Sequence, residues 1–508
     1  MNKILISANA AIDSIFQQMG FNYEKIKTIH ADKEFELLFL LDKEINITKN
    51  ELKKLLRKKR NIAIDIALYQ RVFKKNIKFK QINYLISESD SIFSEIGLID
   101  LFTKIGGVKL KSFYDKNLSI GYNTINNGKL IVLPFEFEKL LTNTDSTRKK
   151  FYFKRKELPS EEVAKLEKGK IRLICENLIK NSFDENNSML ISKNYHPETY
   201  ESTFIFRIDT DFCKIEDAEK LLHLIEKYEI KSTWFLDTEN EKNIKDFYKN
   251  ISGQEIGLHC YKHKIFKKYK DNYDNIKKGK KILHKYGIKP VGFAAPFGEW
   301  NSALQKALEA LNFAYSSDFG YDYDNFPAFP VIEEKKSSVL QIPIHPISPG
   351  RLRRSHFSIH EMITYYKQVI DKKLLLNEPV ILYHHPHHQM FKVIEEIFKY
   401  IRSKPNIWFT TMHNFNKWWR KRDEAEFDYK LGKDRISINK FNFPENLNLR
   451  AAFRGKTTQI MNDDVKLNSL DFKSDKQYHP PRDIERIRSF SWRDLLYNYE
   501  KWKGKRKL

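Results

Sequence analysis

The sequence predicts an α/β protein in which a (β/α) barrel follows a smaller open-sheet α/β domain and precedes a basic C-terminal extension. Three observations support this fold class. The chain has 508 residues, more than one ordinary hydrophobic core accommodates, so we expect several domains. From about residue 202 onward, short apolar runs alternate with helix-like segments for about 200 residues. After about residue 420 the sequence becomes polar and β-rich, and it ends in a basic segment.

The first 180 residues predict a domain of their own, because strand-like and helix-like segments already alternate there. The alternation resembles the amidotransferase-like domains that are sometimes fused ahead of sugar-processing enzymes, although no nucleophile motif is present. We expect strands at residues 3–7, 61–67, 81–87 and 129–134, and helices at residues 11–19 and 50–57.

A helix and a polar connector are expected between this domain and the barrel. Pro159 to Glu162 read as a helix start, and an apolar stripe continues to Leu178. The predicted domain organisation is an α/β amidotransferase-like domain without an evident active site, a connector, the barrel, and the extension, at residues 1–180, 181–200, 201–420 and 421–508.

The formal charge of +24 suits a polyanionic partner: nucleic acid, an anionic membrane face or a phosphate-bearing sugar. No Gly-rich phosphate loop, helix-turn-helix pattern, zinc finger or RNA-recognition signature accompanies the charge, so we expect no specific nucleic-acid partner. No run of about 18 apolar residues is present, which predicts no transmembrane segment and leaves peripheral membrane contact open.

The N-terminus and the cysteines both favour a cytoplasmic protein. Asn9 and Asp13 interrupt the first apolar stretch, so it fits a strand and a helix better than a secretion signal. The three cysteines, Cys175, Cys213 and Cys260, are too few and too scattered for a disulfide framework, as expected in a reducing compartment.

Three strand-like runs of the barrel region end in side chains that can bind a metal or carry a proton. FRIDTDF ends in two alternate carboxylates, Asp209 and Asp211. EIGLHCYKH carries His259 and His263 at a four-residue spacing, which can turn both imidazoles toward one point. ILYHHPHH ends in four histidines, His384, His385, His387 and His388. Because barrel strands present their C-terminal ends on one face, we expect the three clusters to meet.

Each cluster alone has a simpler explanation. An Asp-x-Asp pair is common in turns and helix caps, and a histidine cluster is common in solvated loops. In a chain with 15 histidines, most such pairs bind no metal. Three clusters at three strand ends are much less expected by chance, so we interpret them as one site for a divalent metal.

In this order the clusters resemble the motifs of the polysaccharide deacetylase family, metal-dependent enzymes that remove acetyl groups from N-acetylated sugars. The resemblance covers about residues 202–420 and implies a barrel of the deacetylase type. RIDTD matches the acidic first motif, HCYKH matches the spaced histidine pair, and Leu382 with His385 matches the last, Leu-x-x-His motif. The third motif is a Pro-x-Gly turn, formed here by Pro296, Phe297 and Gly298.

The resemblance implies a role for each cluster. Asp211, His259 and His263 would bind one divalent metal, with Zn²⁺ as the expected ion and Ni²⁺, Co²⁺ or Fe²⁺ as alternatives. Asp209 would act as general base on the attacking water, and His385 as general acid toward the departing amine. Five further residues would bind the substrate or orient the catalytic groups: Arg207, Pro296, Phe297, Gly298 and His384.

One position departs from the family pattern. The third motif usually begins with an arginine that orients the catalytic aspartate, and the matching residue here is Ala294. Arg207 could hold the carboxylate instead; equally, the activity could be altered or lost. His384 is an alternative to His385 as the general acid. RLRRSHF offers three further arginines for the orienting role, Arg351, Arg353 and Arg354.

The predicted function is that of a metal-dependent hydrolase that removes an acetyl group from an N-acetylated sugar in glycan or glycan-precursor biosynthesis. The alternative is a catalytically lapsed deacetylase-fold protein that binds glycans or acts as a scaffold, and Ala294 is its main support. A nucleic-acid-binding role rests on charge alone.

The basic C-terminal segment is expected to pack as a helix on the barrel. Ile484, Ile487, Trp492, Leu495, Tyr499 and Trp502 fall near helical spacing. Acidic residues lie among these aromatic and basic residues, so we prefer a packed helix to a membrane-surface helix.

Overall fold

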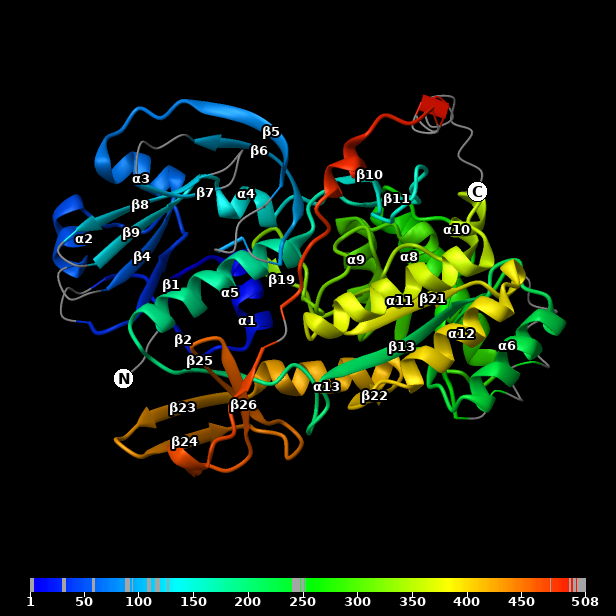
Figure 1. Ribbon diagram of the computed structural model, residues 1–508. Helices are drawn as coiled ribbons and strands as arrows, with labels where there is room; N and C mark the ends of the chain where they lie inside the picture. Colours follow the sequence, from blue (N-terminus) through cyan, green and yellow to red (C-terminus); the bar gives the residue numbers. More distant parts are fainter. Residues whose placement is uncertain are drawn as a thin grey trace.

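The computed structural model describes most of the chain (Figure 1). The described residues are 4–29, 33–56, 60–86, 92–93, 95–106, 111–114, 119–125, 128–239, 247, 251, 253–475, 477–492, 495–496 and 499, with the backbone alone for those between 111 and 125.

An open, mostly parallel sheet forms the N-terminal domain, as the sequence predicts. Its strands have the order β2-β1-β3-β4-β9-β8-β7. The first five strands are parallel to one another, and β8 pairs antiparallel with both β9 and β7. The elements are β1 (Ile4–Ser7), α1 (Ala10–Met19), β2 (Tyr23–Lys25), β3 (Leu37–Leu40), α2 (Lys49–Leu55), β4 (Asn61–Asp65), α3 (Ile66–Phe73), β5 (Phe79–Ile86), β6 (Leu98–Gly106), β7 (Lys111–Tyr114), β8 (Ser119–Ile125), β9 (Gly128–Leu133) and α4 (Phe137–Leu141).

Both faces of this sheet are covered, because alternate strand residues point to opposite sides. Ile4 and Ile6 of β1 belong to a core shared with α1 and α4, whereas Leu5 belongs to a core shared with α2 and α3. The predicted strands and helices of this domain are confirmed within a few residues. The sequence did not predict β2, β3, β6, β7, β8, α3 or α4.

A hairpin and a long helix connect the open sheet to the barrel. β10 (Ser146–Lys150) pairs antiparallel with β11 (Ser160–Ala164), and α5 (Lys168–Glu185) follows. The predicted helix start at Pro159 is therefore wrong, because pairing with β10 overrides the local helix signals. The predicted domain boundary at residue 180 falls inside α5, and β12 (Leu190–Lys193) lies within the predicted connector.

Parallel strands form the barrel, in the order β20-β17-β16-β15-β14-β13-β21, and β22 pairs with the first residues of β13. A 2.9 Å backbone hydrogen bond from His345 to Ile381 links the segment after β20 to β21. The strands are β13 (Ser202–Asp209), β14 (Ser232–Asp237), β15 (Glu255–Cys260), β16 (Gly292–Ala294), β17 (Tyr315–Asp318), β20 (Leu340–Pro343), β21 (Val380–His384) and β22 (Ile407–Phe409). The helices are α6 (Ile215–Lys227), α8 (Tyr269–Lys285), α9 (Ser302–Ala310), α10 (Pro349–Arg354), α11 (Ile359–Leu375), α12 (Phe391–Arg402) and α13 (Met412–Glu424).

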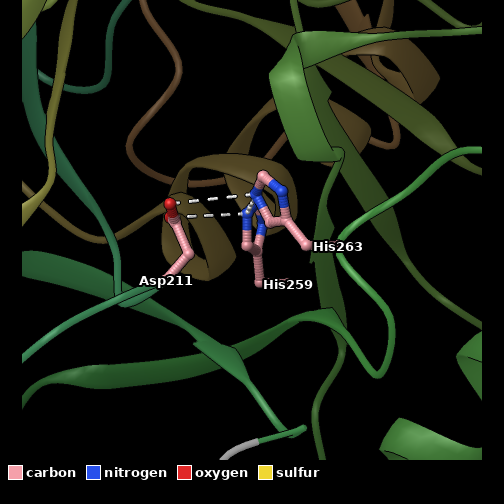
Figure 2. A group of neighbouring side chains, drawn as sticks. All are labelled: Asp211, His259 and His263. Atoms are coloured by element: carbon pink, nitrogen blue, oxygen red, sulfur yellow. Dashed lines mark hydrogen bonds and ion pairs between the residues drawn. The ribbon is translucent and has the colours of Figure 1, made fainter. Parts of the chain in front are cut away.

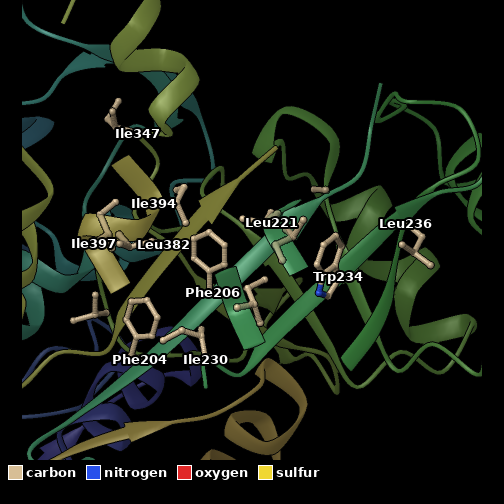
Figure 3. Packing of buried hydrophobic residues seen from close by; sticks show 14 of the residues in the cluster. Phe204, Phe206, Leu221, Ile230, Trp234, Leu236, Ile347, Leu382, Ile394 and Ile397 are labelled. Carbon is tan, nitrogen blue, oxygen red and sulfur yellow. The ribbon is translucent and has the colours of Figure 1, made fainter. Parts of the chain in front are cut away.

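Alternate residues of β13 divide between the hydrophobic core and the interior of the barrel. Phe204, Phe206 and Ile208 belong to the core cluster that includes residues of α6 and α12 (Figure 3). Burying one such side chain stabilises the fold by about 1.5–3 kcal/mol. The period of two therefore places Arg207 and Asp209 on the opposite, interior face of the strand.

The C-terminal extension is β-rich, as expected. Two antiparallel sheets share a small core around Ile436 and Leu449, and β12 from the connector completes one of them. The strands are β23 (Glu426–Leu431), β24 (Arg435–Phe441), β25 (Leu449–Phe453), β26 (Lys456–Ile460), β27 (Asp464–Lys466) and β28 (Lys473–Ser474).

The basic C-terminal segment is helical at residues 492, 495–496 and 499, as predicted, but its predicted packing on the barrel is wrong where the structure describes it. Residues Ile484–Arg488 form a short 3₁₀ helix, and Arg488 is paired with Asp100 of the open-sheet domain. Beyond it, Trp492 is 76% exposed, and Tyr499 is also exposed. Trp502 lies outside the described residues. In the described part of the chain, no helix has the length and apolarity needed to cross a membrane.

A buried histidine makes the stability of the fold depend on pH. The His196 Nε2–H donates to the Asn377 carbonyl, and Nδ1 accepts from the Thr203 hydroxyl, each at 2.8 Å. Burial lowers the pKa of His196 from 6.5 to about 4. The unfolded chain therefore binds a proton below pH 6.5 that the native state excludes. The stability that His196 contributes is therefore fully present above pH 6.5 and is lost as the pH falls toward 4. The free energy of unfolding decreases by about 2 kcal/mol by pH 5 for this reason.

We expect denaturant unfolding of the metal-free protein to show lower stability at pH 5 than at pH 7.5, and His196→Gln to reduce that difference by about 2 kcal/mol. His360→Gln, at an exposed position of α11, serves as the matched control and should leave the difference unchanged. An unaltered pH dependence in His196→Gln would contradict this assignment.

Candidate metal centre and active site

The three predicted clusters converge on one cleft at the C-terminal ends of the barrel strands. Asp209 ends β13 and Asp211 follows it, His259 is the next-to-last residue of β15, and His385 follows β21. These residues, together with His263, all line the same cleft. The C-terminal ends of parallel strands lie on one face of a barrel, so residues far apart in the sequence meet there.

Asp211, His259 and His263 form the candidate metal centre (Figure 2). One ligand atom from each lies within 4.8 Å of the others, and the two Nε2 atoms are 3.0 Å apart. The Asp211 carboxylate lies 3.7 Å from His259 Nε2 and 3.8 Å from His263 Nε2. Two imidazoles and a carboxylate at this separation suit a divalent ion such as Zn²⁺.

The surroundings of these ligands also fit a cation. Asp211 Oδ1 is buried and accepts no hydrogen bond from any described residue. Burial raises the pKa of Asp211 to about 7 and lowers the pKa of His259 to about 3, since neither charged form is solvated there. The Ala294 carbonyl accepts the Nδ1–H of His259 at 2.9 Å, which turns the Nε2 lone pair toward Asp211, as in many metal-binding histidines.

Arg207 holds the candidate base, Asp209. Its Nε donates to Oδ1 at 2.7 Å and its Nη2 donates to Oδ2 at 2.6 Å, and the Ser317 carbonyl accepts from Nη1 at 3.0 Å. Both partners of the pair are almost completely buried. Burial alone would raise the pKa of Asp209, but the Arg207 guanidinium outweighs it and holds that pKa at about 2. Thus Arg207 makes the carboxylate contact that the sequence leaves open at Ala294.

His385, and not His384, faces the carboxylates of Asp209 and Asp211. Its Nε2 lies 3.4 Å from Asp211 Oδ1 and 3.9 Å from Asp209 Oδ2. Burial lowers the pKa of His385 to about 4. His384 is fully buried, its Nε2 is hydrogen-bonded to the Gln389 carbonyl, and it is not among the residues that line the cleft. The geometry therefore gives His384 no contact with a substrate in the cleft.

Two exposed aromatic rings flank the metal centre. Phe297, in the Pro-x-Gly turn, has a left-handed backbone (φ 57°), and its ring meets the His263 ring edge-on at 4.7 Å. Phe212 has φ 54° and lies 6.0 Å from the same imidazole. Left-handed non-glycine residues are costly and concentrate at functional sites. Gly298 also lines the cleft, whereas Pro296 is buried outside its lining.

Part of the cleft could not be predicted from the sequence. Glu161 reaches it from β11, outside the barrel, and pairs with Arg351 of α10 at 2.6 Å. Arg351 is therefore not the partner of Asp209. Arg354 also lines the cleft and Arg353 does not. No local sequence motif identifies Glu161 as a cleft residue, because its position depends on how the β10–β11 hairpin packs on the barrel.

The Arg207–Asp209 pair predicts a large stability effect. Arg207→Met leaves the Asp209 carboxylate buried and unpaired, which should lower the free energy of unfolding by about 3–5 kcal/mol. Denaturant unfolding of the metal-free protein measures this loss. Adding Asp209→Asn should restore part of it, since the unpaired charge is then gone. A loss below about 1 kcal/mol in Arg207→Met would mean that the pair is not held as described.

Comparisons with known proteins find a similarity in the first part of the barrel. Residues 210–316 match the family model for polysaccharide deacetylase, a stretch that contains all three candidate metal ligands. The uncharacterized protein YlxY of Bacillus subtilis is 32% identical over 96 residues, which are 18% of this chain and 30% of that protein. The match thus spans less than a third of that relative.

Two solved structures are also similar to this chain. One is a putative polysaccharide deacetylase from Mycobacterium smegmatis, with 17% identity, a TM-score of 0.38, and coverage of 44% of this chain and 92% of that one. The other is a probable polysaccharide deacetylase from Pseudomonas aeruginosa PAO1, with 15% identity, a TM-score of 0.37 and the same coverage. The similarity to the polysaccharide deacetylase family thus rests on residues 210–316, about a fifth of the chain.

Proposed function

We propose that this protein is a metal-dependent hydrolase that removes the acetyl group from an N-acetylated sugar in glycan or glycan-precursor biosynthesis. The observation that carries the proposal is the meeting of a metal-ligand triad with two proton-carrying groups in one cleft. Asp211, His259 and His263 supply the triad, and Asp209 and His385 lie beside it. Amide hydrolysis needs all of these parts: an electrophile, a base for water and an acid for the amine.

In this proposal, three residues bind the metal and two others transfer protons. Asp211, His259 and His263 hold the divalent ion, with Zn²⁺ as the first choice for this ligand set. When bound, the ion supplies Lewis acidity that polarises the acetyl carbonyl and makes nearby water more acidic. Asp209, fixed by Arg207, accepts the proton of the attacking water. His385 donates a proton to the departing nitrogen.

The distance between the two proton carriers suggests how the proton moves. His385 Nε2 lies 3.9 Å from Asp209 Oδ2, near enough for a proton taken from water by the carboxylate to pass to the imidazole after a small shift. The same proton then leaves on the amine, so acid and base return to their starting forms. One water is consumed, the C–N bond breaks, and acetate and the free amine are the products.

Two contacts favour the hydrolase over the alternative of a lapsed, binding-only barrel. That alternative rested on Ala294, which stands where the family has an orienting arginine. Arg207 makes the corresponding contact with Asp209, and the Ala294 carbonyl itself orients His259. The positions of Asp209 and His385 beside the ligand triad also favour the hydrolase.

The direct test is acetate release from a panel of N-acetylated monosaccharides, sugar nucleotides and oligosaccharides. The purified full chain should release acetate after loading with Zn²⁺, lose this activity with a chelator, and regain it on readdition of metal. Absence of acetate from every N-acetylated sugar, with metal bound, would reject the proposal.

A further inference from the structure

Three arginines line the cleft, and two of them already have carboxylate partners. Arg207 is held by Asp209, and Arg351 is held by Glu161 at 2.6 Å. Arg354 is exposed and lines the same cleft. In the part of the chain that the structure describes, its guanidinium has no ion pair and no hydrogen bond.

The helix that carries Arg354 is fixed on the histidine cluster. α10 packs so closely that a Cβ on Gly350 would lie 2.2 Å from Nδ1 of His388. The Glu161–Arg351 pair fastens the other side of α10 to β11, and Ala164 of β11 donates to the Phe319 carbonyl of the barrel at 2.8 Å. Because α10 is held on both sides, Arg354 has a fixed position at the cleft.

On the side of the cleft next to α10, two guanidinium groups, those of Arg351 and Arg354, share the single carboxylate of Glu161. Arg354 lines the cleft together with His385, His387 and His388. Of the three cleft carboxylates, Glu161 pairs with Arg351, Asp209 pairs with Arg207, and Asp211 is a candidate metal ligand. A cleft with one unpaired guanidinium at its wall attracts a negatively charged group.

We propose that the substrate is an N-acetylated sugar that carries an anionic group, a phosphate or a carboxylate, and that Arg354 binds this group. The proposal rests on the function proposed above and adds the class of substrate. A guanidinium forms paired, charge-assisted hydrogen bonds with either anion, and these bonds are stronger than those between neutral groups. Arg354 is thus a specificity-determining residue, and it takes no part in the transfer of protons.

Binding and turnover can be measured separately. We would titrate the Zn²⁺-loaded full chain by calorimetry with N-acetylglucosamine, N-acetylglucosamine 1-phosphate and N-acetylmuramic acid, at low and high salt. The variant is Arg354→Gln, and the matched control is Arg353→Gln, the neighbouring exposed arginine of α10 that does not line the cleft. The two anionic sugars distinguish a phosphate from a carboxylate as the preferred group.

We expect at least one anionic sugar to bind about tenfold or more tightly than the neutral sugar, and Arg354→Gln to reduce its affinity about ten- to hundredfold. Arg353→Gln should change neither affinity, and high salt should weaken only the anionic sugar. Equal affinities for neutral and anionic sugars, equal losses in the two variants, or no binding of any sugar would overturn the proposal.

The outcome also separates this inference from the proposed function. Binding of the anionic sugar through Arg354 without acetate release would reject the hydrolase and leave the anion site standing. Acetate release from neutral and anionic sugars at equal rates, unchanged in Arg354→Gln, would reject the anion site and leave the hydrolase standing.

Discussion

His259→Ala and His263→Ala are each expected to remove most of the bound divalent ion, to less than about a tenth of an ion per chain, because each deletes one of three protein ligands. Metal content after dialysis, measured by plasma mass spectrometry, gives the result. Circular dichroism and denaturant unfolding should show a folded protein, since His263 follows its strand and is not part of the hydrophobic core.

The exposed His284 of α8 provides the matched control, because His284→Ala removes an imidazole without touching the cleft. It should retain stoichiometric metal. If a folded His259→Ala/His263→Ala double variant still binds one ion per chain, the metal centre lies elsewhere.

Asp209→Asn and His385→Ala are each expected to lower turnover by about a hundred- to ten-thousand-fold. Asparagine keeps the shape of Asp209 and cannot accept a proton, and alanine at residue 385 removes the acid for the amine. Asp209→Asn should keep its metal, because Asp209 is not among the three candidate ligands. Steady-state acetate release by metal-saturated variants measures the effect.

His384→Gln distinguishes the two neighbouring histidines. His384 is buried, is hydrogen-bonded to the Gln389 carbonyl and lies outside the cleft lining, so a folded His384→Gln variant should keep turnover within about tenfold of the wild type. A larger loss in folded His384→Gln than in His385→Ala would reverse the assignment of the acid.

The sequence was sufficient for the parts of the fold that follow from local pattern. Strand alternation placed Asp209 at the end of β13, and the parallel arrangement of barrel strands brought it to His259 and His385, as expected. The same alternation places Arg207 on the interior face, where it donates two hydrogen bonds to Asp209. The sequence could only offer this residue as one of several candidate arginines.

Features that depend on tertiary packing could not be predicted from the sequence. Glu161 enters the cleft because β11 pairs with β10, against a local signal for a helix. Arg351 and Arg354 share a helix, and only the placement of Glu161 distinguishes the paired one from the unpaired one. The basic C-terminal segment has helical spacing of apolar residues, yet Trp492 and Tyr499 remain exposed, since spacing alone does not provide a surface to pack against.

The proposed activity of this cleft is hydrolysis of the amide of an N-acetylated sugar by a metal and a water. Acetate release in ¹⁸O-labelled water, followed by mass spectrometry, tests it most directly. We predict that metal-loaded wild-type protein forms acetate with one ¹⁸O atom and a free amine, and that Asp209→Asn with full metal content forms neither at a comparable rate. Metal-loaded wild-type protein that binds an N-acetylated sugar and releases no labelled acetate would contradict the account.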